Sequence, residues 1–500
     1  MRYLRLCIIM IGAFLITSCS SHDDLLKLVP ADATGVICIN SSKIIEKAGL
    51  GETGNIKIPD YLQKSINQND ASLVSRLMTA LPISGIDFTS NAYVFFSDAV
   101  FNTAVVANLD DAEKTQKWLE QDNTATFKDK DSYKYMLSGN TIYLIGDDKL
   151  FVGRFTSVTL DDAKIFSFAR MVLENNSGKS FADNDEAKKA LSEESDICAY
   201  IRPSTITKLA GLLVGSSNST FAPLINIIAE SDIKALTFSL TFNKDKADFK
   251  SSAIVGPNSQ YVQLINTLAG KPSDEFLKII PKSMDYIVSM SVNGNNLLKL
   301  KEVQKIIATM SLDPKMAAFD LKGAIASVNG PLAVAVYQDP NFNDQSNYVV
   351  AVKSSNPMSI ITQINNYARH YGQAPQRDGN DYIYEYYNQQ ITVGTNGDYV
   401  YFKMLNFQPI DGFAYSDPQV RAFFKKSVMG IYANMRTQDA KTKFGEISMG
   451  SSSPTSSAGN YVPIDKKEPN SIQSFLQLLC SIKADAYSTT GDDSFLPPEK

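Results

Sequence analysis

The sequence is poor in the residue types that most often build catalytic and metal sites. Only two of its 500 residues are histidine, and only five are cysteine. The histidines, His22 and His370, are too few for a histidine-rich zinc site, and a Ser-His-Asp triad would depend on His370 alone. The chain also lacks a Gly-x-Ser-x-Gly elbow, a phosphate-binding loop, a Cys-x-x-Cys pair and an EF-hand loop. We therefore predict no metal, no cofactor and no catalytic residue. An enzyme that uses a pair of carboxylates stays an alternative, because aspartate and glutamate are common in the chain.

The chain also lacks a basic cluster. It has 48 lysines and arginines against 53 aspartates and glutamates, a formal net charge of -5. Because nucleic-acid binding requires basic groups that neutralise phosphates, this balance argues against a nucleic-acid partner. It argues equally against electrostatic attachment to anionic lipid. The proportions of hydrophobic residues, 44%, and charged residues, 20%, are those of a folded globular protein.

The first 18 residues have the pattern of a lipoprotein signal peptide. Arg2 and Arg5 precede an apolar run over residues 6–16, which is shorter than the roughly 20 residues of a membrane-spanning helix. Residues 16–19 resemble the lipobox, with Cys19 as the acylated thiol. We therefore expect cleavage before Cys19, stable anchoring by two or more acyl chains, and a polar tether over residues 19–24. The alternative is a soluble secreted protein in which Cys19 is incidental.

This leader predicts a lipid-anchored protein of the outer membrane that faces either the periplasm or the cell surface. Removal of the leader and acylation of Cys19 leave three cysteines, Cys38, Cys198 and Cys480. An odd number disfavours a disulfide framework. Each lies in an apolar stretch, so we predict three small buried hydrophobic residues.

The two halves of the sequence repeat one another. The matching segments keep their order along the chain: residues 25–30 with 276–281, 93–98 with 334–339, 133–135 with 382–384, 150–152 with 399–401, and 197–202 with 431–436. Strictly alternating segments indicate strands with one buried face, and capped apolar segments indicate helices. The prediction is an α+β fold of two homologous halves, residues 25–270 and 271–500, each of largely antiparallel sheets with helices packed on one face.

The second half differs from the first near the C-terminus. Residues 440–470 are rich in serine and poor in apolar residues, which predicts a mobile loop. Because residues 482–484 match residues 233–235 and the sequence stops at residue 500, we also expect the second half to lack a counterpart of residues 249–270 and to leave a sheet edge open. A partner strand from an envelope protein could add there, or the acidic residues and prolines of the C-terminus could shield the edge.

The candidate ligand site is a row of tyrosines. Tyr382, Tyr384 and Tyr386 alternate along a predicted strand, so their rings would share one face. An exposed row of this kind could stack on sugar rings. The alternative is a buried aromatic cluster, which the matching Tyr133 and Tyr135 of the first half favour.

The lipobox, the short acidic tether, residues 28–33 leading into a strand and the duplicated body resemble the Bacteroidota lipoprotein family catalogued as domain of unknown function 4836. The resemblance covers nearly all of the mature chain and implies the envelope address and the fold, but no catalytic or binding residue. We predict a membrane-anchored envelope lipoprotein that binds or scaffolds a partner without catalysis. A surface glycan- or solute-binding lipoprotein is the alternative, and an unrecognised hydrolase is the third interpretation.

Overall fold

The computed structural model describes residues 24–481, apart from gaps of one to four residues and the longer segments 64–80, 206–230, 339–345, 405–417, 437–442 and 465–470. The predicted signal peptide, Cys19 and the tether before Asp24 lie outside the described residues. The chain divides into two compact units. The first contains residues 1–256 and 465–500, and the second contains residues 257–464.

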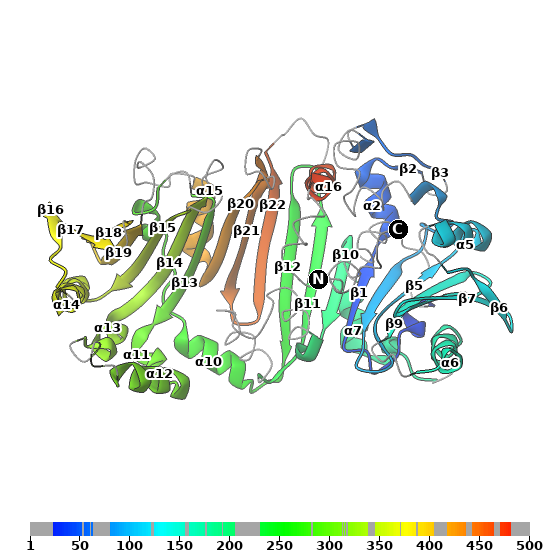
Figure 1. Cartoon of the computed structure of the whole chain (residues 1–500), viewed down its shortest axis with the longest axis horizontal. Helices are drawn as coiled ribbons and strands as arrows, with labels where there is room; N and C mark the ends of the chain where they lie inside the picture. Colours follow the sequence, from blue (N-terminus) through cyan, green and yellow to red (C-terminus); the bar gives the residue numbers. More distant parts are fainter. Residues whose placement is uncertain are drawn as a thin grey trace, which may run out of the picture. The chain divides into compact units, whose positions relative to one another are not determined.

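The first unit is built on an antiparallel sheet. From one edge to the other, its strands are β12 (Ala247–Val255), β11 (Ile233–Phe242), β10 (Ile197–Ile201), β1 (Gly35–Ile39), β4 (Ala92–Phe96), β5 (Phe101–Asn108), β9 (Lys149–Phe155), β8 (Thr141–Ile145), β7 (Tyr133–Ser138) and β6 (Lys128–Lys130). The helices are α2 (Ser41–Ala48), α5 (Ala112–Gln121), α6 (Asp162–Leu173), α7 (Asp185–Leu191) and α16 (Ser471–Ser481), with 3-10 turns η1 (Leu26–Leu28), η2 (Leu81–Ile83) and η3 (Phe181–Asp183) (Figure 1). A small hairpin pairs β2 (Gly51–Glu52) with β3 (Asn55–Ile56).

The second unit has an antiparallel sheet with the same strand order. Its strands are β22 (Ser456–Pro463), β21 (Lys443–Ser453), β20 (Met429–Arg436), β13 (Tyr286–Asn293), β14 (Val328–Gln338), β15 (Ser346–Ser354), β19 (Tyr399–Met404), β18 (Gln389–Asn396), β17 (Asp381–Tyr386) and β16 (Gln376–Asp378). The helical elements are α10 (Gln260–Leu268), η4 (Glu275–Lys278), α11 (Gly294–Leu297), α12 (Lys301–Ser311), α13 (Leu321–Ser327), α14 (Pro357–His370) and α15 (Pro418–Lys426). The mixed, largely antiparallel fold class is confirmed.

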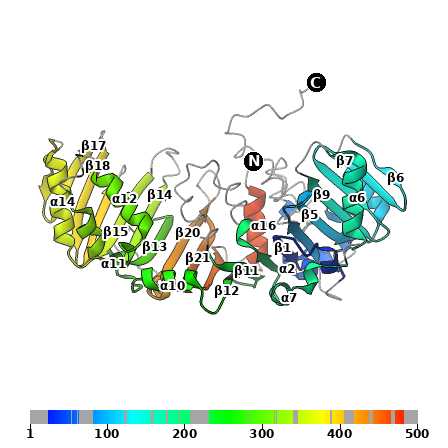
Figure 2. The same ribbon diagram turned by 90° about the horizontal axis from the view of Figure 1, so that it is seen from below.

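Helices cover one face of the second sheet through η4 and α15, and α14 covers the other face at the β18–β19 end, so the prediction of helices packed on one face is wrong for this unit. Side chains alternate between the faces along β19. Tyr399 and Tyr401 join a core cluster with Phe424 of α15, whereas Val400 between them joins a cluster with Ile361 of α14. Figure 2 shows α14 lying along the strands at this end of the sheet. The strands accept helices on both sides because their runs are apolar on both faces.

The predicted mobile loop over residues 440–470 is also wrong, since β21 and β22 form a hairpin over most of it. These strands are the counterparts of β11 and β12. The second unit therefore contains the strand that was predicted to be missing. Backbone hydrogen bonds join such strands whatever their side chains. The fully buried ring of Tyr461 packs over Gly445, where an added Cβ would lie 2.3 Å from the ring. Gly445 therefore makes room for this ring, and the low apolar content of the segment does not indicate a loop.

The units also depart from the predicted boundary between residues 270 and 271. Helix α10 belongs to the second unit, and α16, from the C-terminal part of the chain, belongs to the first. The Ser471 backbone N–H donates to the Asn243 carbonyl at 3.2 Å, and the rings of Phe242 and Phe475 are 5.7 Å apart. A contact between residues so distant in the chain leaves no local signal in the sequence.

The helix ends that were predicted from adjacent residues are confirmed. Asp161 accepts a hydrogen bond from Lys164 N at 2.7 Å and caps α6, and Gly49 ends α2 in the left-handed region at φ 68°. Cys38 and Cys198 are buried and lie opposite each other in β1 and β10, which confirms the prediction of buried cysteines for these two. Cys480 lies in α16, and its side chain is outside the described residues.

Gly85 offers a test of close packing in the first unit. It has φ +69°, and a Cβ at this position would lie 2.3 Å from the Asp111 carbonyl oxygen at the start of α5. We expect Gly85→Ala to lower the free energy of unfolding by about 2 kcal/mol more than Gly139→Ala. Gly139 has φ +55° with nothing within 4 Å, so this control isolates the collision from the backbone strain. Equal losses in urea unfolding of the two variants would show that the collision is relieved without cost.

Candidate functional site

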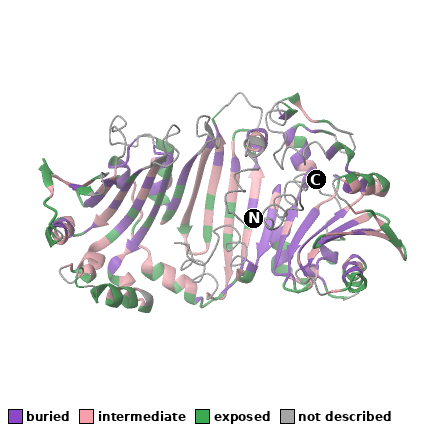
Figure 3. Cartoon of the chain, viewed as in Figure 1, coloured by how far each residue is buried: buried purple, intermediate pink, exposed green. Residues whose placement is uncertain are grey.

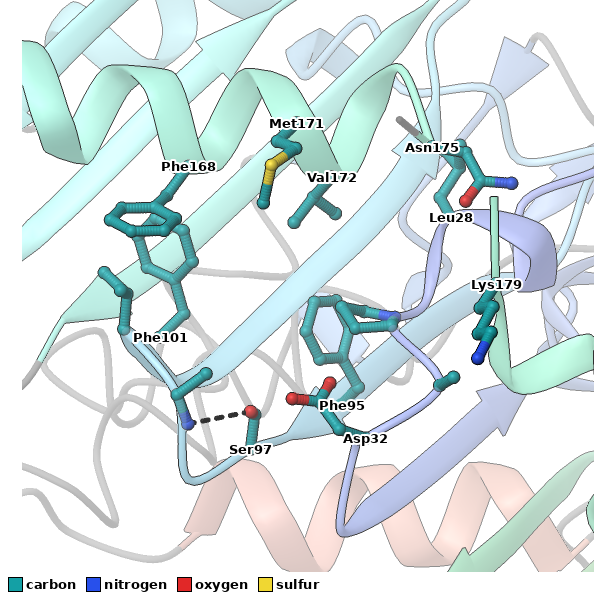
Figure 4. Close-up of a pocket in the computed structure, with 14 residues that line it drawn as sticks. Leu28, Asp32, Phe95, Ser97, Phe101, Phe168, Met171, Val172, Asn175 and Lys179 are labelled. Carbon is teal, nitrogen blue, oxygen red and sulfur yellow. Dashed lines mark hydrogen bonds between the residues drawn. The ribbon is translucent and has the colours of Figure 1, made fainter. Parts of the chain in front are cut away.

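The first unit contains an apolar pocket with a volume of about 350 Å³. Three parts of the chain form its walls: the segment between η1 and β1, the turn between β4 and β5, and α6 with the residues after it. Figure 4 shows the side chains of Phe168, Met171 and Val172 pointing from α6 into the pocket. The volume falls in the range of about 300–1,000 Å³ that is typical of small-molecule sites.

Hydrogen bonds between distant segments hold the walls in place. The Phe181 backbone N–H donates to the Val29 carbonyl at 2.8 Å, and Pro30 and Ser180 form a β-bridge. These contacts tie the segment after η1 to the chain that follows α6. In the turn between β4 and β5, the Ser97 hydroxyl accepts a hydrogen bond from Ala99 N at 3.0 Å. The walls are therefore ordered by contacts that do not require a ligand.

The pocket has a buried floor and an exposed rim. Leu28, Phe95 and Phe101 are buried and belong to the core of the first unit. On the rim, Phe168 is 37% exposed and Met171 is 45% exposed. These two residues lie three positions apart and therefore on one side of α6. Large apolar side chains gathered at the mouth of an apolar hollow indicate a surface for an apolar ligand.

The polar groups of the pocket do not form a catalytic constellation. Its lining includes one carboxylate, Asp32, and one amine, Lys179, together with Ser97 and Asn175, but neither histidine nor cysteine. Glycoside hydrolysis ordinarily uses two carboxylates, and a Ser-His-Asp triad needs a histidine. Within the described part of the chain, no group of three or more metal-ligating side chains comes together. The arrangement can bind an apolar group, and it places one charge of each sign among the lining residues.

The structure does not place the predicted tyrosine row on the surface. Tyr384 is buried in a cluster with Ile361 and Val393, and its hydroxyl donates to the Asn365 side-chain oxygen of α14. Burial raises the pKa of Tyr384 above its ordinary value. Tyr382 is half-buried and packs against the same cluster. The side chain of Tyr386 lies outside the described residues. The glycan interpretation depended on an exposed row. Because Tyr384 is covered, the prediction that this row is exposed is wrong for its central residue.

The second unit contains a cluster of three interacting polar side chains. Tyr401 donates a hydrogen bond to Asp381, and Lys403 Nζ lies 3.9 Å from the centre of the Tyr401 ring. Burial, followed by the hydrogen bond to Asp381, raises the pKa of Tyr401 well above its ordinary range. Burial lowers the pKa of Lys403. Gly394 leaves room for the pair, since its Cβ would lie 2.2 Å from an Asp381 carboxylate oxygen. These groups satisfy one another inside the fold.

The pocket is not among the sites predicted from the sequence. One signal was present, because residues 165–173 of α6 carry apolar side chains around most of the helix rather than along one stripe. A helix on the surface of a sheet needs one apolar stripe, so the additional Phe168 and Met171 indicated a second apolar surface. The other walls come from residues 28–32 and 95–101, and their approach to α6 is a long-range contact.

Comparison with known proteins gives one family and a few partial structural matches. The family model described as "Domain of unknown function (DUF4836)" matches residues 26–403. No curated protein matches the chain. The solved structure titled "Structure of crystal form III of TP0453" has a TM-score of 0.32 and 13% identity, and the match covers 51% of this chain and 90% of that one. Crystal form IV of the same protein has a TM-score of 0.29 at 13% identity, with 48% and 83% covered. Among the described residues, no helix has the length and apolar character needed to cross a membrane.

Proposed function

The chain belongs to the family of domain of unknown function 4836, and from this premise we propose that it is a lipid-anchored envelope protein that binds a small apolar ligand without catalysing a reaction. The family match extends over the whole pocket, since it spans residues 26–403. The observation that carries the proposal is the apolar pocket of the first unit, with Phe168 and Met171 at its mouth.

The anchor in this proposal is Cys19. It is supported by the basic residues, the short apolar run and the lipobox-like residues 16–19 that precede the tether. We assign the protein to the outer membrane, facing the periplasm or the cell surface, and to the lipoproteins of Bacteroidota. An acyl anchor would retain the protein at a membrane without a spanning helix.

We also propose that the two units arose by duplication. The repeated segments of the sequence support this, as does the matching strand order of the two sheets. In each unit, the strand after the first 3-10 turn lies in the middle of the strand order, and the two C-terminal strands lie side by side at one end of that order. Only the first unit has a helix equivalent to α6 among the described residues, so the pocket is a feature that the second unit does not repeat there.

Ligand binding can be tested with the fluorescent apolar probe N-phenyl-1-naphthylamine. We expect wild-type protein to bind the probe and Met171→Gln to bind it about fivefold more weakly, because about 1 kcal/mol of apolar contact is lost. The matched control is Ile83→Gln, since Ile83 is an exposed apolar residue of the same unit outside the pocket lining. Absence of a fluorescence increase, or an equal loss in both variants, would refute the proposal.

A further inference from the structure

One face of the second sheet is apolar and open. Its large side chains are 37% to 46% exposed, although they lie in the middle of the sheet rather than at an edge. We call this surface the open face and define it by seven residues of four adjacent strands: Met429 and Ile431 of β20, Tyr286, Val288 and Met290 of β13, Leu332 of β14, and Tyr348 of β15. Figure 3 shows exposed and buried residues alternating along these strands.

The strand register brings these residues together. Val288 lies between Ile431 and Val334, and Met290 lies between Met429 and Leu332. In the third row, Tyr286 is flanked by Ala433 and Val336, and Val336 pairs in turn with Tyr348. The half-buried valines fill the spaces between the exposed side chains. No charged or polar residue interrupts the three rows.

Along β13 and β14, the opposite and covered face carries several smaller side chains. The buried positions include Ser289 and Ser291 beside Ile287 on β13, and Ala333 and Ala335 on β14. This face is closed by η4 and α15 through a core that includes Phe276 and Phe424. A sheet with large apolar side chains on its exposed side is suited to burial on that side as well.

Next to the open face, the same side of the sheet is covered by a helix. On β18 and β19, which continue the sheet beyond β15, Val393 and Val400 are covered by Ile360 and Ile361 of α14. This helix has 14 residues, which corresponds to a length of about 21 Å. An amphipathic helix is therefore the element that this face buries where it is covered.

The size of the open face also favours a single helix over a second copy of the chain. Four strands about 4.8 Å apart and three rows about 7 Å apart give roughly 300–400 Å². A stable dimer usually buries about 800 Å² on each partner, so a symmetric contact through this face alone would be at most about half the usual size. A helix about 10–12 Å wide and about 14 residues long matches the area, and its contacting stripe would be uncharged.

We propose that the open face of the second unit is a docking surface for one amphipathic helix of a partner protein. The helix would present apolar residues at i, i+3, i+4 and i+7 to the rows of β20, β13 and β14, as helices do when they bind in apolar grooves. None of its seven residues lines the pocket of the first unit.

The experiment uses the full-length protein in its own cells, with the photo-crosslinking residue p-benzoyl-phenylalanine placed in turn at Val288, Met290 and Ile431. These side chains are exposed, so the substitutions should not disturb folding. We expect crosslinks to one partner polypeptide, with the three attachment sites at helical spacing on one segment. The control position is Glu385, an exposed residue of β17, which should give no such crosslink.

A second variant separates docking from folding. Val288→Thr combined with Met290→Gln should leave the urea midpoint unchanged and reduce crosslinking from Ile431 about tenfold, because apolar contact to the helix is lost. Crosslinks to a second copy, to the first unit or to lipid, or no crosslink at all, would overturn the proposal. Met171→Gln should leave the crosslinks unchanged, so failure of the pocket and failure of the docking surface can be distinguished.

Discussion

Replacing Cys19 with alanine is expected to abolish incorporation of labelled palmitate and to move the protein from the membrane fraction to the aqueous fraction. The expected effect is nearly complete because Cys19 supplies the only thiol of the proposed lipobox. A hydrocarbon chain contributes about 0.8 kcal/mol for each buried CH₂ group, and two chains together hold a protein stably at a membrane. The measurements are radiolabelling and membrane fractionation.

Cys7→Ala is the matched control for the anchor. Cys7 lies in the apolar run that precedes the cleavage point, so its removal should leave both the label and the membrane association unchanged. Labelling that persists in Cys19→Ala would contradict the anchor, and so would wild-type protein recovered in the aqueous fraction with its leader uncleaved.

Replacing Asp196 with alanine is expected to lower the free energy of unfolding of the first unit by about 3 kcal/mol. The Asp196 carboxylate is fully buried, and its two oxygens accept hydrogen bonds from Lys47 Nζ at 2.7 and 2.8 Å. It also accepts one from the Phe242 backbone N–H at 2.5 Å. The group therefore joins α2, β11 and the chain before β10. Alanine would leave a buried backbone N–H without its acceptor and remove the partner of an amine, although Lys47 can reach water because it is partly exposed.

Two further variants show whether the loss comes from this network. Asp196→Asn keeps an oxygen for Phe242 N and should cost less than alanine. Asp24→Asn removes an exposed ion pair with Lys27 and should not change stability measurably, because water and salt screen such pairs. Urea unfolding of the three variants provides the measurement. If Asp196→Ala unfolded at the same urea concentration as Asp24→Asn, the buried carboxylate would not stabilise the unit.

Features encoded by a few adjacent residues could be predicted from the sequence. The cap of α6 at Asp161 and the left-handed end of α2 at Gly49 depend on contacts within one helical turn. The turn at Gly397, with φ 57°, depends on two residues between β18 and β19. The repeated order of strands was visible in the same way, since each strand carries its own alternating or apolar pattern.

Features that depend on the packing of distant segments required the tertiary structure. The sequence showed that Tyr384 alternates with Tyr382, but only α14 determines that this tyrosine is covered. Serine and glycine in β21 indicate a loop by composition, but the ring of Tyr461 in β22 packs over Gly445 and makes this segment a strand of the sheet.

The sequence by itself determined the helix ends and turns, and it predicted the leader, the acylation motif and the repeat, because each of these features depends on adjacent residues. Only the tertiary structure showed the pocket with Phe168 at its mouth and the open face around Val288. Whether an apolar side chain is buried or exposed depends on which remote segment packs against it, and residue order does not specify that contact.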